Sequence, residues 1–251
     1  MTIIVFTGPT LAPPEAAQEL DAIYRPPVSE GDVYRAALEE PRAIGIIDGY
    51  FENVPSVWHK EILYALSRGV RVLGSASMGA LRAAELGQFG MEGVGATFEA
   101  FRDGLLEDDD EVAVIHGPAE LGYPMLSEAM VNIRRTLSDA HAAGIIGSRT
   151  LGGLERAAKQ LHYRDRSYHA VLAAAKAAGL PEEELDRFRC WLPDGRVDQK
   201  REDAKLMLRV LREWRKQDGR DTPAAFHFEH TTLWEHATRR AVQGGEAGAD
   251  V

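Results

Sequence analysis

The sequence contains a single cysteine, Cys190, in 251 residues. One thiol excludes an intrachain disulfide and a zinc site built from cysteines, and scarce cysteine is typical of proteins from a reducing compartment. We therefore expect a cytoplasmic protein.

Positive charge is also scarce. The chain has 29 Lys and Arg residues against 39 Asp and Glu residues, which gives a formal net charge of -10. General nucleic-acid binders gain much of their affinity from lysine and arginine side chains on phosphates. The composition therefore argues against nucleic acid as a partner and favours proteins or small molecules.

Long apolar runs are missing as well. A membrane-spanning helix needs roughly 18 or more consecutive apolar residues, and no segment reaches that length. The apolar run from Met1 to Phe6 has no basic flank and is broken by Thr7, Gly8 and Pro9. It predicts a first strand and not a signal peptide, so we expect no membrane association.

Motifs for metals and cofactors are not found. His59 and His116 lack zinc-protease spacing, and Gly90 to Gly95 lacks the full dinucleotide fingerprint. The acidic run from Asp108 to Glu111 offers oxygen ligands for Mg²⁺, but adjacent acids more often form a solvated loop. The sequence predicts no metal and no cofactor.

The first half of the chain alternates between strand and helix patterns. Short β-branched runs at 2–6, 43–47 and 70–73 are typical of buried parallel strands, and helical spacing covers 33–39 and 55–68. A small-residue turn at 74–79 leads into a further helix through residue 85. This order predicts an α/β fold with a small, mostly parallel sheet and flanking helices.

The second half is richer in alanine and arginine at helical spacing, notably over 154–161, 168–178 and 203–215. We expect an α/β core over 1–140 and a predominantly helical half over 141–240 packed on it, with a soft boundary that leaves one domain open. The small and polar end of the chain predicts a flexible tail over 241–251.

A serine stands at the predicted strand-to-helix turn, in the order Gly74-Ser75-Ala76-Ser77-Met78-Gly79. A sharp turn exposes a nucleophilic hydroxyl, and the N–H groups of Met78 and Gly79 at the start of the helix would stabilise an oxyanion. Small residues also let a helix pack closely on a sheet, so the turn alone leaves both interpretations open.

Lys60 is the candidate base for this serine. In a right-handed strand-helix-strand crossover, the start of the helix and the end of the next strand share one edge of the sheet. That edge is where open α/β sheets place their ligands. A partly desolvated lysine can take the serine proton, because burial favours its neutral amine. The alternative is an exposed lysine beside Glu61.

These residues resemble the TfuA-like family. The resemblance rests on the runs 59–63 and 77–86, the latter reading SMGALRAAEL, and on Gly8-Pro9-Thr10, Asp48-Gly49, 109–114, 130–134 and 163–168. It covers most of residues 1–170. It implies an α/β arrangement outside the common superfolds.

The family resemblance also implies a function and partners. Such proteins act beside YcaO enzymes in peptide backbone thioamidation, cleave the thiocarboxylated end of a ThiS-type ubiquitin-fold carrier to release sulfide, and help YcaO to engage its peptide or protein substrate. The implied catalytic pair is Ser77 as nucleophile and Lys60 as base, which makes the protein a hydrolase. The alternative is a noncatalytic adaptor that binds YcaO and its peptide.

Further residues are candidates for supporting roles. Thr10, Asp48, Gly49 and Arg82 are expected in oxyanion or substrate binding, although Asp48 can instead cap a helix and Arg82 can pair with Glu85. Asn132 and Arg134 are expected to support the site or an interface. Cys190, beside Trp191, is more often buried packing than a persulfide-carrying sulfur relay.

Overall fold

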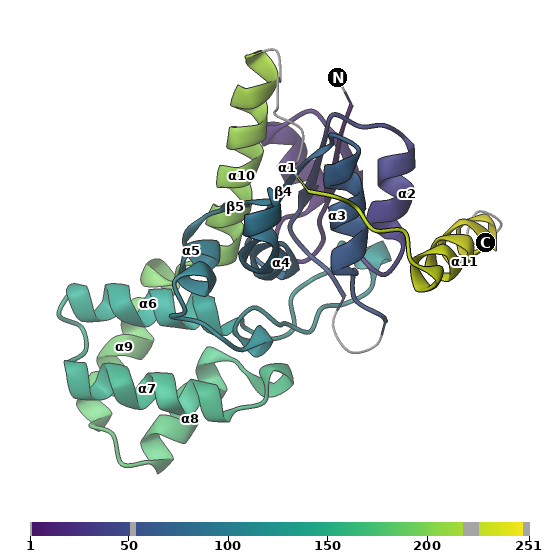
Figure 1. Cartoon of the computed structure of the whole chain (residues 1–251). Helices are drawn as coiled ribbons and strands as arrows, with labels where there is room; N and C mark the ends of the chain where they lie inside the picture. The colour runs from purple at the N-terminus through teal and green to yellow at the C-terminus, as the bar shows by residue number, and fades with distance from the viewer. Residues whose placement is uncertain (1, 51–53, 218–225, 248–251) are drawn as a thin grey trace. The chain divides into compact units, whose positions relative to one another are not determined.

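Figure 1 shows a sheet with helices packed around it. The sheet has five parallel strands in the order β2-β1-β3-β4-β5. The computed structural model describes residues 2–50, 54–217 and 226–247. The strands are β1 (Ile3–Phe6), β2 (Ile23–Arg25), β3 (Ala43–Ile46), β4 (Arg71–Ser75) and β5 (Glu92–Val94). This confirms the α/β prediction. The strand order is that of flavodoxin-like sheets, so the expectation of an uncommon arrangement does not hold for the sheet.

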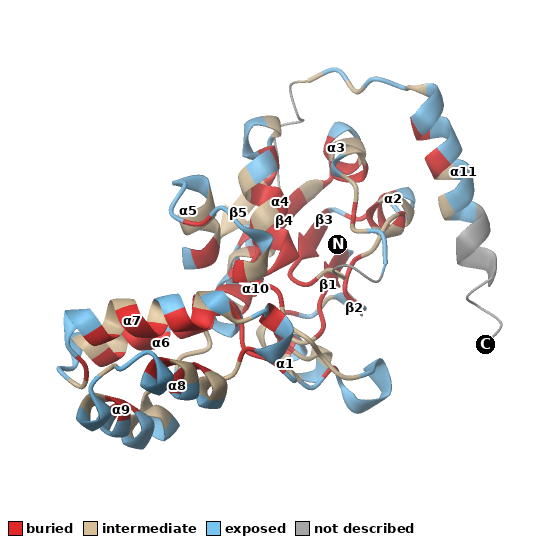
Figure 2. Cartoon of the chain, turned by 90° about the horizontal axis from the view of Figure 1, so that it is seen from below, coloured by how far each residue is buried: buried red, intermediate tan, exposed pale blue. Residues whose placement is uncertain are grey.

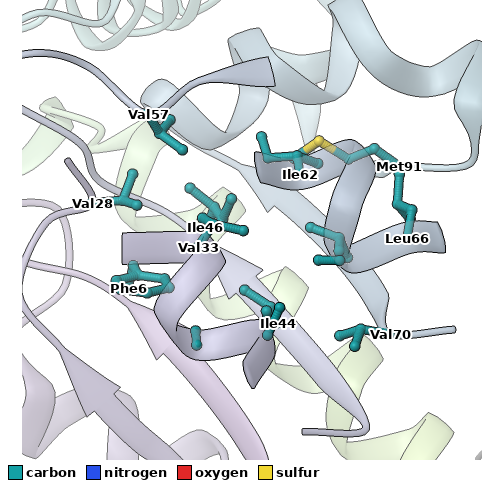
Figure 3. Close-up of a cluster of buried hydrophobic side chains, with 14 of the residues drawn as sticks. Phe6, Val28, Val33, Ile44, Ile46, Val57, Ile62, Leu66, Val70 and Met91 are labelled. Atoms are coloured by element: carbon teal, nitrogen blue, oxygen red, sulfur yellow. The ribbon is translucent and has the colours of Figure 1, made fainter. Parts of the chain in front are cut away.

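Each face of the sheet is buried by its own set of helices. Alternate residues of β1 point to opposite faces, so Ile4 and Phe6 join one core while Ile3 and Val5 join the other. The first core contains α2 (Asp32–Leu38), α3 (His59–Ser67) and α4 (Met78–Leu86), and the second contains α1 (Pro13–Glu19) and α10 (Gln199–Lys216). Figure 3 shows Phe6, Ile44 and Ile46 of the strands facing Val33 and Ile62 of the helices. Burial on both faces explains the continuous apolar runs of the strands.

The third helix starts later than the predicted range 55–68. It begins at His59 because the carboxylate of Glu61 accepts the N–H of Trp58 at 3.2 Å. The same carboxylate accepts the N–H groups of Gly31 at 2.8 Å and Tyr34 at 3.2 Å at the start of α2. Burial raises the pKa of Glu61 despite these three bonds. One buried side chain therefore fixes the beginnings of two neighbouring helices.

The chain divides into two compact units at different residues from the expected boundary near 140. One unit contains residues 1–107 and 201–251, and the other contains residues 108–200. The first unit takes in residues 201–251 because the apolar stripe of α10, including Met207, Leu208 and Leu211, completes a core on the sheet. The first unit also contains α5 (Ala96–Arg102) and α11 (Thr232–Ala247).

The second unit is helical and has its own core. Its buried residues include Ile133, Leu154, Leu172 and Phe188. Figure 2 shows these helices buried on one side and exposed on the other. They are α6 (Met130–Ala142), α7 (Ser148–Gln160), α8 (Tyr168–Ala177) and α9 (Glu182–Gly195).

The end of the chain was expected to be a flexible tail over 241–251. Helix α11 continues to Ala247, and residues 248–251 lie outside the described residues, so the flexibility of the tail stays a prediction. In the described part of the chain, no helix combines the length and apolar character needed to cross a membrane.

Candidate active site

The loops after β1, β3 and β4 carry most of the candidate residues. Because the strands are parallel, their carboxyl ends meet at one edge of the sheet. Thr10 follows β1, Asp48 and Gly49 follow β3, and Ser77 follows β4. The sheet therefore brings these predicted residues to one edge.

Asp48 ties two of these loops together. Its Oδ2 accepts the N–H groups of Gly8 at 2.9 Å and Thr10 at 3.0 Å, and its Oδ1 accepts the Thr10 hydroxyl at 2.5 Å. Asp48 is 2% exposed and Thr10 is also buried. Both side chains are engaged with each other, so their contacts fix the shape of the edge.

Asp48→Ala is expected to lower the free energy of unfolding by about 3 kcal/mol, because two buried N–H groups and a hydroxyl lose their acceptor. Asp48→Asn is the matched control: its amide oxygen can accept both N–H groups and its NH₂ can donate to Thr10, so the loss should be about 1 kcal/mol. Urea unfolding at neutral pH measures both. Equal losses in the two variants would show that the negative charge, not the acceptors, is what stabilises this edge.

The backbone turn before Ser77 is strained. Ala76 has a φ of 64°, and the Ser77 N–H donates to the Ser75 carbonyl at 2.7 Å, which closes a three-residue γ-turn. A γ-turn with positive φ at a residue other than glycine is rare, and such strain is often found at functional sites. The turn delivers Ser77 to the start of α4, where its side chain makes no capping hydrogen bond. The hydroxyl is therefore not used to stabilise the helix.

Ser75 is the neighbouring hydroxyl and lies in a different environment. It is fully buried, and its Oγ donates to the Val94 carbonyl at 2.8 Å. This bond joins the ends of β4 and β5. Ser77, at 3% exposed, is the better placed of the two at the edge of the sheet.

Two glycines hold α4 against the sheet. A Cβ on Gly79 would lie 1.8 Å from the Ile46 carbonyl oxygen, and one on Gly74 would lie 2.0 Å from the Gly79 oxygen. The Gly79 N–H donates to the Ile47 carbonyl at 3.2 Å, so it is not free to bind an oxyanion as expected. Among the described residues, the Met78 N–H has no hydrogen-bond partner. One of the two expected donors is therefore available.

Gly49 serves close packing. A Cβ there would lie 2.7 Å from Cγ of Met78, whose side chain is 2% exposed. The loop after β3 thus approaches the first residue of α4 directly. The contact gives Gly49 a packing role next to Ser77.

Lys60 is the second residue of α3 and is half-buried. Its Nζ donates to Oγ1 of Thr231 at 3.1 Å and lies 5.5 Å from the ring centroid of Phe228. Within the described part of the chain, no hydrogen bond joins Lys60 to Ser77. Thr231 and Phe228 were not predicted, because nothing in the sequence pattern links them to a lysine some 170 positions earlier.

Arg82 is hydrogen-bonded to the segment before α3. Its guanidinium donates to the Val57 carbonyl at 3.3 Å and to Glu85 at 2.7 Å, and Glu85 also contacts His59 at 2.7 Å. Burial acts to raise the pKa of Glu85, but the bonds from His59 and Arg82 outweigh it, so the pKa lies below its ordinary value. The pairing of Arg82 with Glu85 is confirmed. These contacts favour a positioning role for Arg82 over carboxylate binding.

Asn132 lies inside the helical unit. It is fully buried, its amide donates to Glu128 at 2.8 Å and Asp198 at 3.0 Å, and its oxygen accepts the Lys200 N–H at 3.1 Å. Burial raises the pKa of Glu128. These bonds tie α6 to the start of α10, so the contacts of Asn132 are structural.

Arg134 and the acidic run form an ion-pair network in the same unit. Arg134 binds both oxygens of Glu111 at 2.9 Å, and Lys159 contacts Asp110 and Glu111. Glu111 is 3% exposed, so the expectation of a solvated acidic loop is wrong for this residue. The opposite charges come from 23 to 56 positions away and enclose Glu111, while Asp108 stays exposed. In the described ranges, no cluster of three or more His, Cys, Asp or Glu side chains is placed to hold a metal ion.

Asp110→Asn is expected to lower the free energy of unfolding by about 3 kcal/mol at neutral pH, because fully buried Arg166 donates to Asp110 Oδ2 at 2.8 Å. Burial acts to raise the pKa of Asp110, but Lys159 and Arg166 outweigh it and hold the pKa below 3.8. Its stabilisation is therefore present above pH 3.8 and lost as the pH falls through the lowered pKa.

Urea unfolding of wild type and Asp110→Asn at several pH values tests this. The deficit of the variant should shrink as the pH falls below 3.8. The control is Asp108→Asn, whose side chain is 68% exposed and should change stability by less than about 1 kcal/mol. A deficit that is the same at every pH would contradict the charge argument.

Cys190 lies on α9 and is exposed, so the expectation of buried packing is wrong. Its neighbour Trp191 turns toward Phe188, with ring centroids 6.2 Å apart. The tryptophan packs while the cysteine faces solvent, because adjacent helical residues point in different directions.

Comparison with known proteins agrees with the resemblance noted in the sequence. A search of curated proteins finds no match. Residues 48–167 match the family model described as TfuA-like protein. This segment includes Asp48, Lys60, Ser77 and Arg134, and over it the chain is similar to the TfuA-like protein family.

Proposed function

We propose that this protein is the accessory protein of a YcaO-dependent peptide backbone thioamidation system, and that it releases sulfide from a thiocarboxylated ThiS-type carrier. The match to the TfuA-like family model supports the accessory role. The observation that supports a hydrolase is the strained turn at Ala76, which delivers Ser77 to a helix start with its hydroxyl unused for capping.

In this proposal, the Ser77 oxygen attacks the carbonyl carbon of the carrier's terminal thiocarboxylate. The C–S bond of the tetrahedral intermediate breaks, sulfide leaves with the proton taken from Ser77, and the carrier remains as an ester on the serine. Water then cleaves the ester to a carboxylate. The net change is thiocarboxylate plus water to carboxylate plus hydrogen sulfide, with no oxidant or reductant.

The surrounding groups have defined roles in these steps. Lys60 accepts the serine proton as general base and returns it to the leaving sulfide. The Met78 N–H, unpaired among the described residues, donates to the developing oxyanion at the positive end of α4. Thr10, Asp48 and Gly49 shape the edge that receives the carrier's tail.

A noncatalytic adaptor is the second candidate, and two observations favour it. Ser77 is 3% exposed, and the Lys60 ammonium is bonded to Thr231. Because Ser77 is buried and Lys60 is bonded elsewhere, the pair cannot turn over substrate without a rearrangement. In the adaptor, the chain binds YcaO and its peptide, and the serine turn only supports packing.

The two functions are separated by incubating the purified protein with a thiocarboxylated ThiS-type carrier. Free sulfide and the mass of the carrier are measured, with and without the YcaO partner. Sulfide release with conversion of the carrier to the carboxylate supports the hydrolase. An unchanged carrier, together with full support of thioamidation when sulfide is supplied, supports the adaptor. We place the reaction in the cytoplasm, with the carrier, YcaO and its peptide or protein substrate as partners.

A further inference from the structure

The C-terminal segment of the chain holds the candidate base. Lys60 Nζ donates to the Thr231 hydroxyl at 3.1 Å and faces the Phe228 ring at 5.5 Å. An ammonium is attracted both by a hydroxyl oxygen and by an aromatic face. Both partners lie outside residues 48–167, the segment that matches the family model. We call residues 228–234, which supply these contacts, the latch.

The latch has a defined anchor. Trp234 is 3% exposed, and its ring lies 5.3 Å from Tyr34, 5.4 Å from Tyr64 and 5.3 Å from Phe228, measured between centroids. The Thr231 hydroxyl also accepts the backbone N–H of Trp234 at 3.3 Å, at the start of α11. The Thr231 oxygen that accepts the bond from Lys60 is therefore held in place by a second bond, from the backbone at the start of α11.

Two open pockets lie along the surface on which the latch and α11 pack. An open pocket of about 240 Å³ lies at the contact and is lined by Trp58, His59, Lys60, Thr231, Leu233 and Trp234. A second pocket of about 310 Å³ lies further along α11, beside Arg35 and Arg240. Both pockets are open to solvent, so the rim of the contact is exposed, and exposed contacts open more readily than a closed core. Leu233 is 61% exposed and offers apolar surface to an incoming protein.

We propose that the latch is an autoinhibitory element that keeps Lys60 bonded to Thr231 in the isolated protein, and that docking of the sulfide-consuming partner enzyme displaces it. This inference rests on the proposed function, in which Lys60 acts as the base for Ser77. Release of the latch frees the amine to approach Ser77. Sulfide is then formed only when the enzyme that uses it is bound.

The first test needs no catalytic activity. The full chain is treated with a small amine-acylating reagent, and modification of Lys60 is followed by mass spectrometry relative to exposed Lys176. Thr231→Val and Phe228→Leu should label several-fold faster at Lys60 than wild type. Thr231→Ser keeps the hydroxyl and should behave like wild type. Thr238→Val is the matched control, because its hydroxyl bonds Glu235 on the same helix without contacting Lys60.

The second test measures sulfide release from the thiocarboxylated carrier. Without the partner enzyme, Thr231→Val should be several-fold faster than wild type, and addition of the partner should bring wild type to the rate of the variant. Unchanged labelling of Lys60, or a slower Thr231→Val, overturns the latch. Faster labelling with no sulfide from any variant contradicts the proposed function alone.

Discussion

Ser77→Ala is expected to reduce sulfide release from a thiocarboxylated carrier by about 10³-fold or more, because removing the nucleophile of a covalent mechanism leaves only binding and oxyanion contacts. The variant should fold, since the Ser77 side chain makes no capping bond to α4. Release is measured in single-turnover reactions with the partner enzyme present, and circular dichroism checks the fold.

Ser75→Ala is the matched control two positions earlier. Its hydroxyl donates to the Val94 carbonyl, so alanine should cost about 1 kcal/mol of stability while sulfide release stays within a few-fold of wild type. Lys60→Ala should lose release together with Ser77→Ala, and the double variant should be no worse than either single variant, because the two residues act as a unit. A Ser77→Ala variant that still releases sulfide at the wild-type rate would rule out the serine mechanism.

Much of the sheet edge could be predicted from the sequence, because the rules that place it are local. Short β-branched runs become strands, parallel strands end at one edge, and the residues after them, such as Asp48 and Ser77, come to that edge. The strands β2 and β5 were not predicted. Each has three residues, and neither is fully buried, so neither leaves a continuous apolar run in the sequence.

The partners of the charged residues could not be predicted, because they come from distant parts of the chain. The acidic run from Asp108 to Glu111 looks like a solvated loop until Arg134, Lys159 and Arg166 are placed around it. In the same way, Lys60 looks like an ordinary surface lysine until Thr231 is found beside it. Hydrophobic periodicity reports which side of an element is buried, but it carries no information about which distant polar group is met there.

Gly79→Ala is expected to cause a large loss of stability, about 4 kcal/mol or more, because its Cβ would lie 1.8 Å from the Ile46 oxygen and 2.6 Å from the Ile46 carbonyl carbon. Both atoms belong to the backbone of β3, so no side-chain rotation relieves the overlap. Helix α4 would have to move away from the sheet and would break the 3.2 Å bond from Gly79 N–H to Ile47. Chemical unfolding measures the loss, and failure to obtain folded protein is the extreme form of the same result.

Gly87→Ala is the control at the other end of α4. Gly87 has helical angles, φ -56° and ψ -38°, and a Cβ there meets nothing within 4 Å, so alanine should leave stability unchanged or raise it by about 0.4–1 kcal/mol. Comparing Gly79→Ala with Gly87→Ala distinguishes the loss caused by the clash with β3 from the general effect of replacing glycine in a helix. If Gly79→Ala were as stable as Gly87→Ala, α4 could not lie directly on β3. The oxyanion role of the Met78 N–H would then lose its basis, since that contact positions the start of α4 beside Ser77.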